Sequence, residues 1–117
     1  MRFTVEYFNP GVLKTIESWP VEVLADYARL VELVTDVGPR VGLPHSRALG
    51  KGLFELRPRG RGNTGRVLFG YVQGKRIIVV HAFMKKTRKT PQKHLVLARR
   101  RIQEIQREQR HVRTDPS

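Results

Sequence analysis

The stretch I-I-V-V-H-A-F-M-K-K-T-R-K-T-P, residues 77–91, is the part of the chain around which the rest is organised. It opens on an apolar run, 77–80, that is typical of a buried strand, and the segment 92–110 after it has the spacing of a basic amphipathic helix. Four cations stand where the strand gives way to the helix: Lys85, Lys86, Arg88 and Lys89. Like charges so close together repel one another, so the stretch indicates either an anion-binding site or a solvated charged loop.

The helix after this stretch has a clear start and a clear apolar face. Thr90 suits the N-cap position and Pro91 the first helical position. An apolar stripe at spacings of three and four then predicts a helix to about Arg110: Leu95, Ala98, Ile102 and Ile105. Lys93 and His94 lie in its first turn, where the helix dipole disfavours positive charge unless an anion binds. We expect residues 111–117 to form a disordered tail.

Alternating patterns predict three antiparallel strands that form a meander: 53–57, 66–71 and 76–84. A flexible basic turn, 59–65, joins the first two strands. The alternation puts Glu55 and Arg57 on one face of the first strand, and it puts Arg66 opposite the aromatic face of the second. The third strand is apolar at both parities, so its pattern does not decide the direction of His81.

The N-terminal part of the chain supplies one more strand and two helices. Alternation predicts a strand over 3–7, and helical spacing predicts a short helix over 12–19 and a longer one over 20–37. The segment 38–52, with four glycines and two prolines, is typical of an irregular connection. The order β-α-α-β-β-β-α predicts one small α+β domain over 1–110, with a mainly antiparallel sheet and the two N-terminal helices packed on one face.

Charge is distributed unevenly along the 117 residues. The formal net charge is +13, yet residues 1–46 hold only four Lys and Arg against six Asp and Glu. The excess therefore lies in residues 47–117, where a basic surface suits RNA, DNA, an acidic protein or an anionic membrane. A membrane is the weakest of these, because the basic helix has no aromatic residue on its apolar face. No apolar run is long enough to span a bilayer, no secretory signal is recognisable and no cysteine occurs, so we expect a cytoplasmic protein.

Several of the cations are expected to converge on one face of the sheet. If the first two strands of the meander pair, Arg57 and Arg66 lie together, and the third strand delivers Lys85 at its end. Guanidinium groups bind a phosphate through two hydrogen bonds, whereas lysines act as mobile point charges. The alternative is a set of scattered arginines beside a flexible basic loop.

The histidines and one aromatic residue have both functional and structural interpretations. His81 and His94 suit proton transfer because imidazole titrates near neutrality, but each also fits a structural or solvated role. Phe83 could stack on a base, although an aromatic residue at a strand end is more often part of the core. No histidine pair has metal-ligand spacing with a nearby carboxylate, so no metal site is expected.

Three motifs resemble, in this order, the toxins of RelE/HigB type, and most closely the branch also found in phage genomes. They are S-R-A-L-G-K-G-L-F-E-L-R at 46–57, R-V-L-F at 66–69 and I-I-V-V-H-A-F-M-K-K-T-R-K-T-P at 77–91, and the resemblance covers roughly residues 1–110. It implies a RelE-like fold and a ribosome-dependent mRNA endoribonuclease, or mRNA interferase, that inhibits translation without a metal or cofactor. It also implies a cognate antitoxin, often with a helix-turn-helix domain.

The resemblance also implies roles for particular residues. The ribose 2′-OH would attack the adjacent phosphate, and four cations would bind that phosphate and stabilise the transition state: Arg57, Arg66, Lys85 and Lys86. Further contacts to RNA are expected from Arg59, Arg61, Phe83, Arg88, Lys89 and Lys93. His94 stands where the family pattern has Glu, which leaves the general base open between His81, His94 and another group. The alternative function is a non-catalytic basic protein that binds nucleic acid or regulates a phage.

Overall fold

The structure is a computed structural model that describes residues 2–85 and 89–114, with side chains described as far as residue 109. The predicted site residues Lys86 and Arg88 therefore lie outside the described residues, as do residues 115–117 of the predicted tail.

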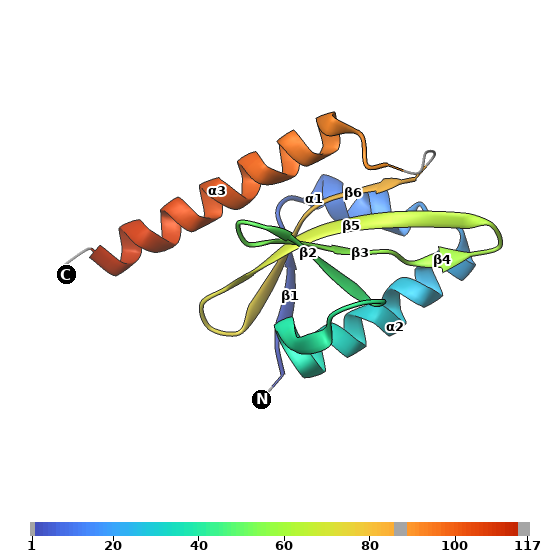
Figure 1. Ribbon diagram of the computed structural model, residues 1–117, viewed down its shortest axis with the longest axis horizontal. Helices are drawn as coiled ribbons and strands as arrows, with labels where there is room; N and C mark the ends of the chain where they lie inside the picture. Colours follow the sequence, from blue (N-terminus) through green and yellow to red (C-terminus); the bar gives the residue numbers. More distant parts are fainter. Residues whose placement is uncertain (1, 86–88, 115–117) are drawn as a thin grey trace.

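Helices and strands follow the predicted order, with two additional strands. The chain forms β1 (Thr4–Tyr7), α1 (Pro10–Glu17), α2 (Val21–Val37), a 3₁₀ turn η1 (Gly38–Val41), β2 (Ser46–Gly50), β3 (Leu53–Leu56), β4 (Arg59–Gly60), β5 (Asn63–Val72), β6 (Arg76–Met84) and α3 (Gln92–Thr114). The strands lie in the order β1-β6-β5-β3-β2, and β4 pairs with the start of β5 (Figure 1). Only the β1–β6 pair is parallel among the described strands, so the predicted mainly antiparallel sheet is confirmed.

The sheet is covered on both faces, and each face has its own apolar core. Helices α1 and α2 pack on one face through Val12, Ile16 and Leu30, against strand residues that include Val67 and Phe69. Helix α3 packs on the other face, where its stripe contacts a second core: Leu53, Leu68, Ile78, Val80 and Phe83. Figure 1 shows α2 and α3 on opposite sides of the sheet. The predicted α+β domain with both N-terminal helices on one face is therefore confirmed.

A bulge in β6 decides which residues face α3. Phe69 pairs with Val79 and Leu68 pairs with His81, so Val80 is the extra residue on β6. Consecutive side chains of a strand normally point to opposite faces of the sheet, but here Val80 and His81 both face α3. Val80 belongs to the core under α3, and His81 contacts His94 on that helix. The bulge therefore settles the direction of His81, which the apolar pattern of β6 leaves open.

Three boundaries differ from the prediction. Segment 38–52, predicted to be irregular, contains strand β2, which pairs with β3. Most residues of β2 are exposed, the strand ends in a glycine, and its sequence shows no apolar alternation. The predicted turn 59–65 contains β4, two residues that pair with Asn63 and Thr64. Helix α3 continues to Thr114, past its predicted end near Arg110, and nothing in the sequence breaks the helix before Pro116.

Gly70 in β5 lets α3 approach the sheet closely. A Cβ atom at Gly70 would lie 2.4 Å from Ile102 Cδ1 and 3.0 Å from the backbone oxygen of Gly52. We expect Gly70→Ala to lower the free energy of unfolding by about 1–3 kcal/mol, the usual cost of overpacking. Urea denaturation measures this change. The double variant Gly70→Ala/Ile102→Val should recover part of the loss, since valine lacks the Cδ1 atom; strictly additive losses would contradict the proposed contact.

Candidate active site

The two arginines predicted to converge meet on one buried carboxylate. Arg57 Nε donates to Glu55 Oε1 at 2.8 Å, and Arg66 Nη1 donates to Glu55 Oε2 at 2.5 Å. Glu55 lies on β3 and Arg66 on the neighbouring β5, so the contact crosses two strands. The side chains of Glu55 and Arg66 are 1% and 4% exposed, whereas that of Arg57 is 27% exposed. Arg57 is therefore the more accessible of the two cations.

Glu55 is a site residue that the sequence reasoning did not select. Burial by itself raises the pKa of this carboxyl, but the hydrogen bonds from Arg57 and Arg66 outweigh burial and lower the pKa below its usual value. The carboxylate is thus charged at neutral pH and holds both guanidinium groups. Its position two residues before Arg57, on the same strand face, was the signal that could have identified it.

A pocket of about 260 Å³ opens beside this ion-pair network. Four of its lining residues are cations and one is an acid: Arg47, Arg57, Arg66, Lys89 and Glu55. Arg47 lies directly opposite Glu55 in the β2–β3 pair. The sequence did not predict Arg47 as a site residue, because it did not predict strand β2. The pocket is an electropositive hollow of the kind that binds a phosphate.

The loop before α3 closes the pocket through Thr90. Its hydroxyl donates to Glu55 Oε2 at 3.3 Å and lies 3.4 Å from Arg66 Nη1, which donates to it. Thr90 therefore joins the ion-pair network, and α3 begins two residues later, at Gln92. In addition, the Nε atom of Arg66 is buried and has no hydrogen-bond partner among the described residues, so its capacity to donate is unused.

Lys85 lies close enough to this network to be affected by its charge. Its backbone N–H donates to the Thr64 carbonyl at 2.8 Å, which fixes the end of β6 beside β5. Desolvation lowers the pKa of Lys85, and the positive charges of Arg66 and Arg57 lower it further. The charges of the two arginines thus reach Lys85, although Lys85 is not among the residues that line the pocket.

His81 and His94 form a direct pair under α3. His81 Nε2 and His94 Nδ1 are 2.7 Å apart. Burial, and then the charges of His94 and Arg101, lower the pKa of His81 to about 4, and burial followed by the charge of Lys93 lowers that of His94. Both rings are therefore neutral at pH 7, and one of them donates the shared hydrogen bond.

Phe83 connects the histidine pair to the arginines but is itself a core residue. It pairs with Arg66 across β5 and β6, and its ring stacks on His94 at a centroid distance of 3.7 Å. Only 8% of Phe83 is exposed. Core packing and the His94 ring cover Phe83, which favours its structural interpretation over stacking on an RNA base.

Of the other predicted RNA contacts that the structure describes, only Lys89 lines this pocket. The exposed Arg61 pairs with Glu22 at 3.1 Å. Arg59 begins β4, and its backbone N–H donates to Asp26. Lys93 is exposed in the first turn of α3.

Two negative findings concern the described part of the chain. Residues 2–85 and 89–114 contain no group of three or more His, Cys, Asp or Glu side chains arranged to hold a metal ion. No helix in the same residues is both long and apolar enough to cross a membrane.

The protein is thus a small α+β domain with a cationic pocket, in which the buried carboxylate of Glu55 binds two of the cations. By sequence, the chain belongs to the family of phage-derived Gp49-like proteins, whose model matches residues 14–103. Its fold is similar to that of a double arginine-to-alanine variant of the E. coli toxin RelE in the free state, with a TM-score of 0.55 and 14% identity over 70% of this chain and 82% of that one. The predicted RelE-like fold is thereby confirmed. No curated protein sequence matches the chain.

The Glu55 network predicts an unequal effect of two matched substitutions. Glu55→Gln leaves Arg66 buried without a countercharge, so we expect the free energy of unfolding to fall by about 3 kcal/mol. Glu22→Gln, which breaks the exposed pair with Arg61, should cost less than about 1 kcal/mol. Urea denaturation at pH 7 measures both. Equal losses would show that the buried carboxylate has no special role in stability.

The depressed pKa of His81 predicts a loss of stability in mild acid. The unfolded chain takes up a proton near pH 6.5, whereas the folded chain resists protonation until about pH 4. Stability from this group is therefore complete above pH 6.5 and is lost as the pH falls towards 4. Because His81 is only half-buried, we expect a loss of about 1–2 kcal/mol between pH 7 and pH 5. Urea denaturation of the wild-type protein and of His81→Asn at pH 7 and pH 5 measures this change, and we expect the variant to show the smaller loss.

Proposed function

We propose that this chain is the toxin of a toxin-antitoxin system and acts as a ribosome-dependent mRNA endoribonuclease. The observation that carries the proposal is the cationic pocket organised by Glu55, which lies on a fold similar to that of the toxin RelE. The matched family is described as phage-derived, which agrees with the phage branch of toxins that the sequence motifs resemble. The proposed partners are mRNA, the ribosome and a cognate antitoxin with a helix-turn-helix domain, and the proposed location is the cytoplasm.

The proposed reaction is an in-line displacement at phosphorus. The ribose 2′-oxygen forms a bond to the adjacent phosphorus, and the bond from phosphorus to the 5′-oxygen of the next nucleotide breaks. The 2′-OH loses a proton to a base, and the leaving 5′-oxygen gains a proton. The products are a 2′,3′-cyclic phosphate and a 5′-hydroxyl end. Negative charge increases on the phosphate oxygens in the transition state, so preorganised cations accelerate the reaction.

We assign different roles to the cations according to how exposed their side chains are. Arg57 is partly exposed and lines the pocket. Its Nε donates to Glu55, and its terminal nitrogens make no hydrogen bond within the described residues, so they can bind the phosphate. Arg47, Lys85 and Lys89 add positive charge around the same hollow. Arg66 is buried and bound to Glu55 and Thr90, so we propose that it holds the network in position.

The histidine pair supplies a base of the right protonation state. Both rings are neutral at pH 7 because their pKa values are lowered. In the tautomer in which His94 Nδ1–H donates to His81 Nε2, the lone pair of His94 Nε2 is free to accept a proton. We propose His94 as the proton acceptor, with His81 fixing its tautomer. This assignment agrees with the absence of the family's usual Glu at position 94.

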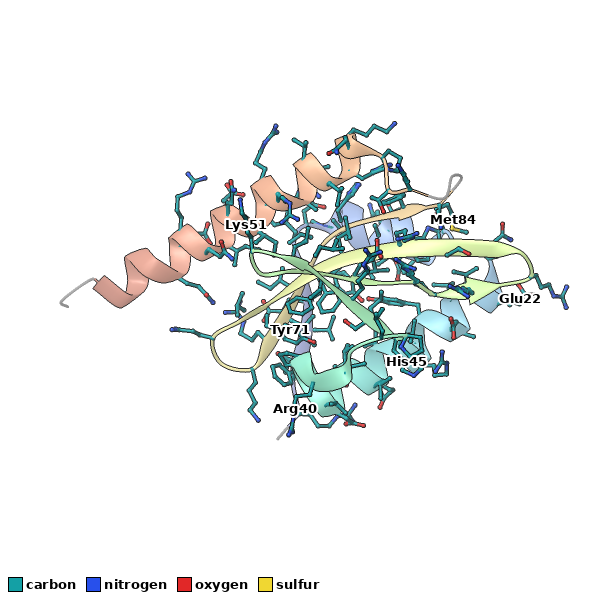
Figure 2. The ribbon with its side chains drawn as sticks, in the orientation of Figure 1. Glu22, Arg40, His45, Lys51, Tyr71 and Met84 are labelled. Carbon is teal, nitrogen blue, oxygen red and sulfur yellow. The ribbon has the colours of Figure 1, made fainter. Side chains whose placement is uncertain are left out.

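Cleavage of a translated message by matched single-charge variants tests the proposal. Arg57→Ala removes the accessible guanidinium, so we expect kcat to fall by about 100-fold or more, as when a transition-state donor is lost. Arg57 is a better probe than Arg66, because its side chain is partly exposed and its removal leaves the buried Arg66 on Glu55 as a countercharge. The control, Arg40→Ala, removes the same charge from an exposed residue of the 3₁₀ turn outside the pocket (Figure 2).

The measurement uses purified ribosomes, a defined message and mapping of new 5′ ends. Wild-type protein and Arg40→Ala should cut the message at the same positions. An uncut message with the wild-type protein would exclude the nuclease, and salt-dependent RNA binding without cleavage would then favour a non-catalytic basic binding protein. Normal cleavage by Arg57→Ala would show that the site is elsewhere.

A further inference from the structure

A second pocket shares Arg57 with the candidate active site. It has a volume of about 210 Å³ and lies between α2, the end of the loop before β2, and the start of β4. Its lining includes Pro44, His45, Arg57 and Arg59. Drug-sized ligands need pockets of roughly 300 Å³ or more, so this hollow suits a smaller group such as one nucleobase.

Asp26 on α2 holds two walls of this pocket in place. Its Oδ1 accepts a hydrogen bond from Arg29 Nε at 2.9 Å, and its Oδ2 accepts one from the backbone N–H of Arg59 at 2.7 Å. Both carboxylate oxygens are thereby used within the protein. Asp26 therefore shapes the pocket, and a ligand would be held by other lining groups.

His45 is the lining residue best suited to hold a planar ligand. It lies directly before β2, and Arg57 lies directly after β3. Ser46 and Leu56 form the last pair of the β2–β3 ladder, so His45 and Arg57 are next to each other in sequence register just beyond it. His45 is half-buried, and no hydrogen bond or ion pair of its ring occurs among the described residues. Figure 2 shows His45 beside α2. An imidazole ring without internal partners, next to Pro44, offers a flat surface for a base.

We propose that this pocket, here called the His45 pocket, binds the nucleobase of a nucleotide that flanks the scissile phosphate. The inference rests on the proposed function and deepens it. Arg57 lines both hollows, so a phosphate bound to Arg57 places the nucleotide on one side of it at the His45 pocket. The base stacks on the imidazole, and Arg59 adds a cation at the pocket wall. His45 is thus a specificity-determining residue outside the catalytic network.

Short synthetic RNAs that carry one abasic nucleotide test this pocket. Each RNA programmes purified ribosomes and carries the mapped cleavage site, with the base intact or removed on either side of the scissile phosphate. For the wild-type protein, we expect removal of one flanking base to lower kcat/KM about tenfold, the usual size of one base stack, and removal of the other to have a smaller effect.

His45→Ala should lower kcat/KM about tenfold on the intact RNA and make the enzyme insensitive to loss of that base, because the same contact is then already missing. His45→Phe, which keeps a flat ring, should retain sensitivity to the missing base. A merely structural role for His45 would lower activity on every RNA by the same factor.

The outcomes separate this inference from the function on which it rests. If the wild-type protein cuts the intact RNA but His45→Ala keeps the full sensitivity to both abasic RNAs, the His45 pocket does not bind the base, while the nuclease assignment stands. If the wild-type protein leaves the intact RNA uncut, the proposed function fails and the base pocket fails with it.

Discussion

The buried carboxylate of Glu55 is the interaction on which the site depends. An ionised carboxyl inside a protein is strongly unfavourable unless charge and hydrogen bonds offset its lost hydration. Arg57 and Arg66 supply both, and Thr90 adds a third contact. One side chain therefore ties β3 to β5 and to the entry of α3, and it holds two guanidinium groups at a fixed separation. Such cations need little reorganisation when an anion arrives, which is the physical requirement for stabilising a charged transition state.

Part of the basic charge is structural. Arg101 Nη1 donates to the Val80 carbonyl at 2.7 Å, at the residue that the β6 bulge inserts. Arg99 donates to the carbonyls of Leu49 and Gly50 at the exposed end of β2. These arginines of α3 satisfy backbone groups that the ladder leaves unpaired, which also fastens α3 to the sheet. A net charge of +13 thus overstates the cations available to a polyanion.

Local patterns predicted much of the fold, and their failures have physical causes. The helical spacing of 20–37 and the strand pattern of 76–84 match α2 and β6 closely, because both elements bury long apolar stretches. Strand β2 was missed because it lies at a sheet edge and is stabilised by pairing with β3, without an apolar face of its own. Arg47 was missed with it. The sequence left both base stacking and a core role open for Phe83, because a strand end gives no sign of the helix that covers it.

The sequence by itself determined the order of the elements, the concentration of charge in residues 47–117 and the face of each short strand on which Arg57 and Arg66 lie, since these follow from local periodicity and composition. The tertiary structure decided which cations share a pocket, which ones satisfy the backbone, and that His81 faces His94. The reason is that alternation defines a face within one strand only. Strand pairing, the bulge in β6 and the packing of α3 determine which distant side chains meet on that face.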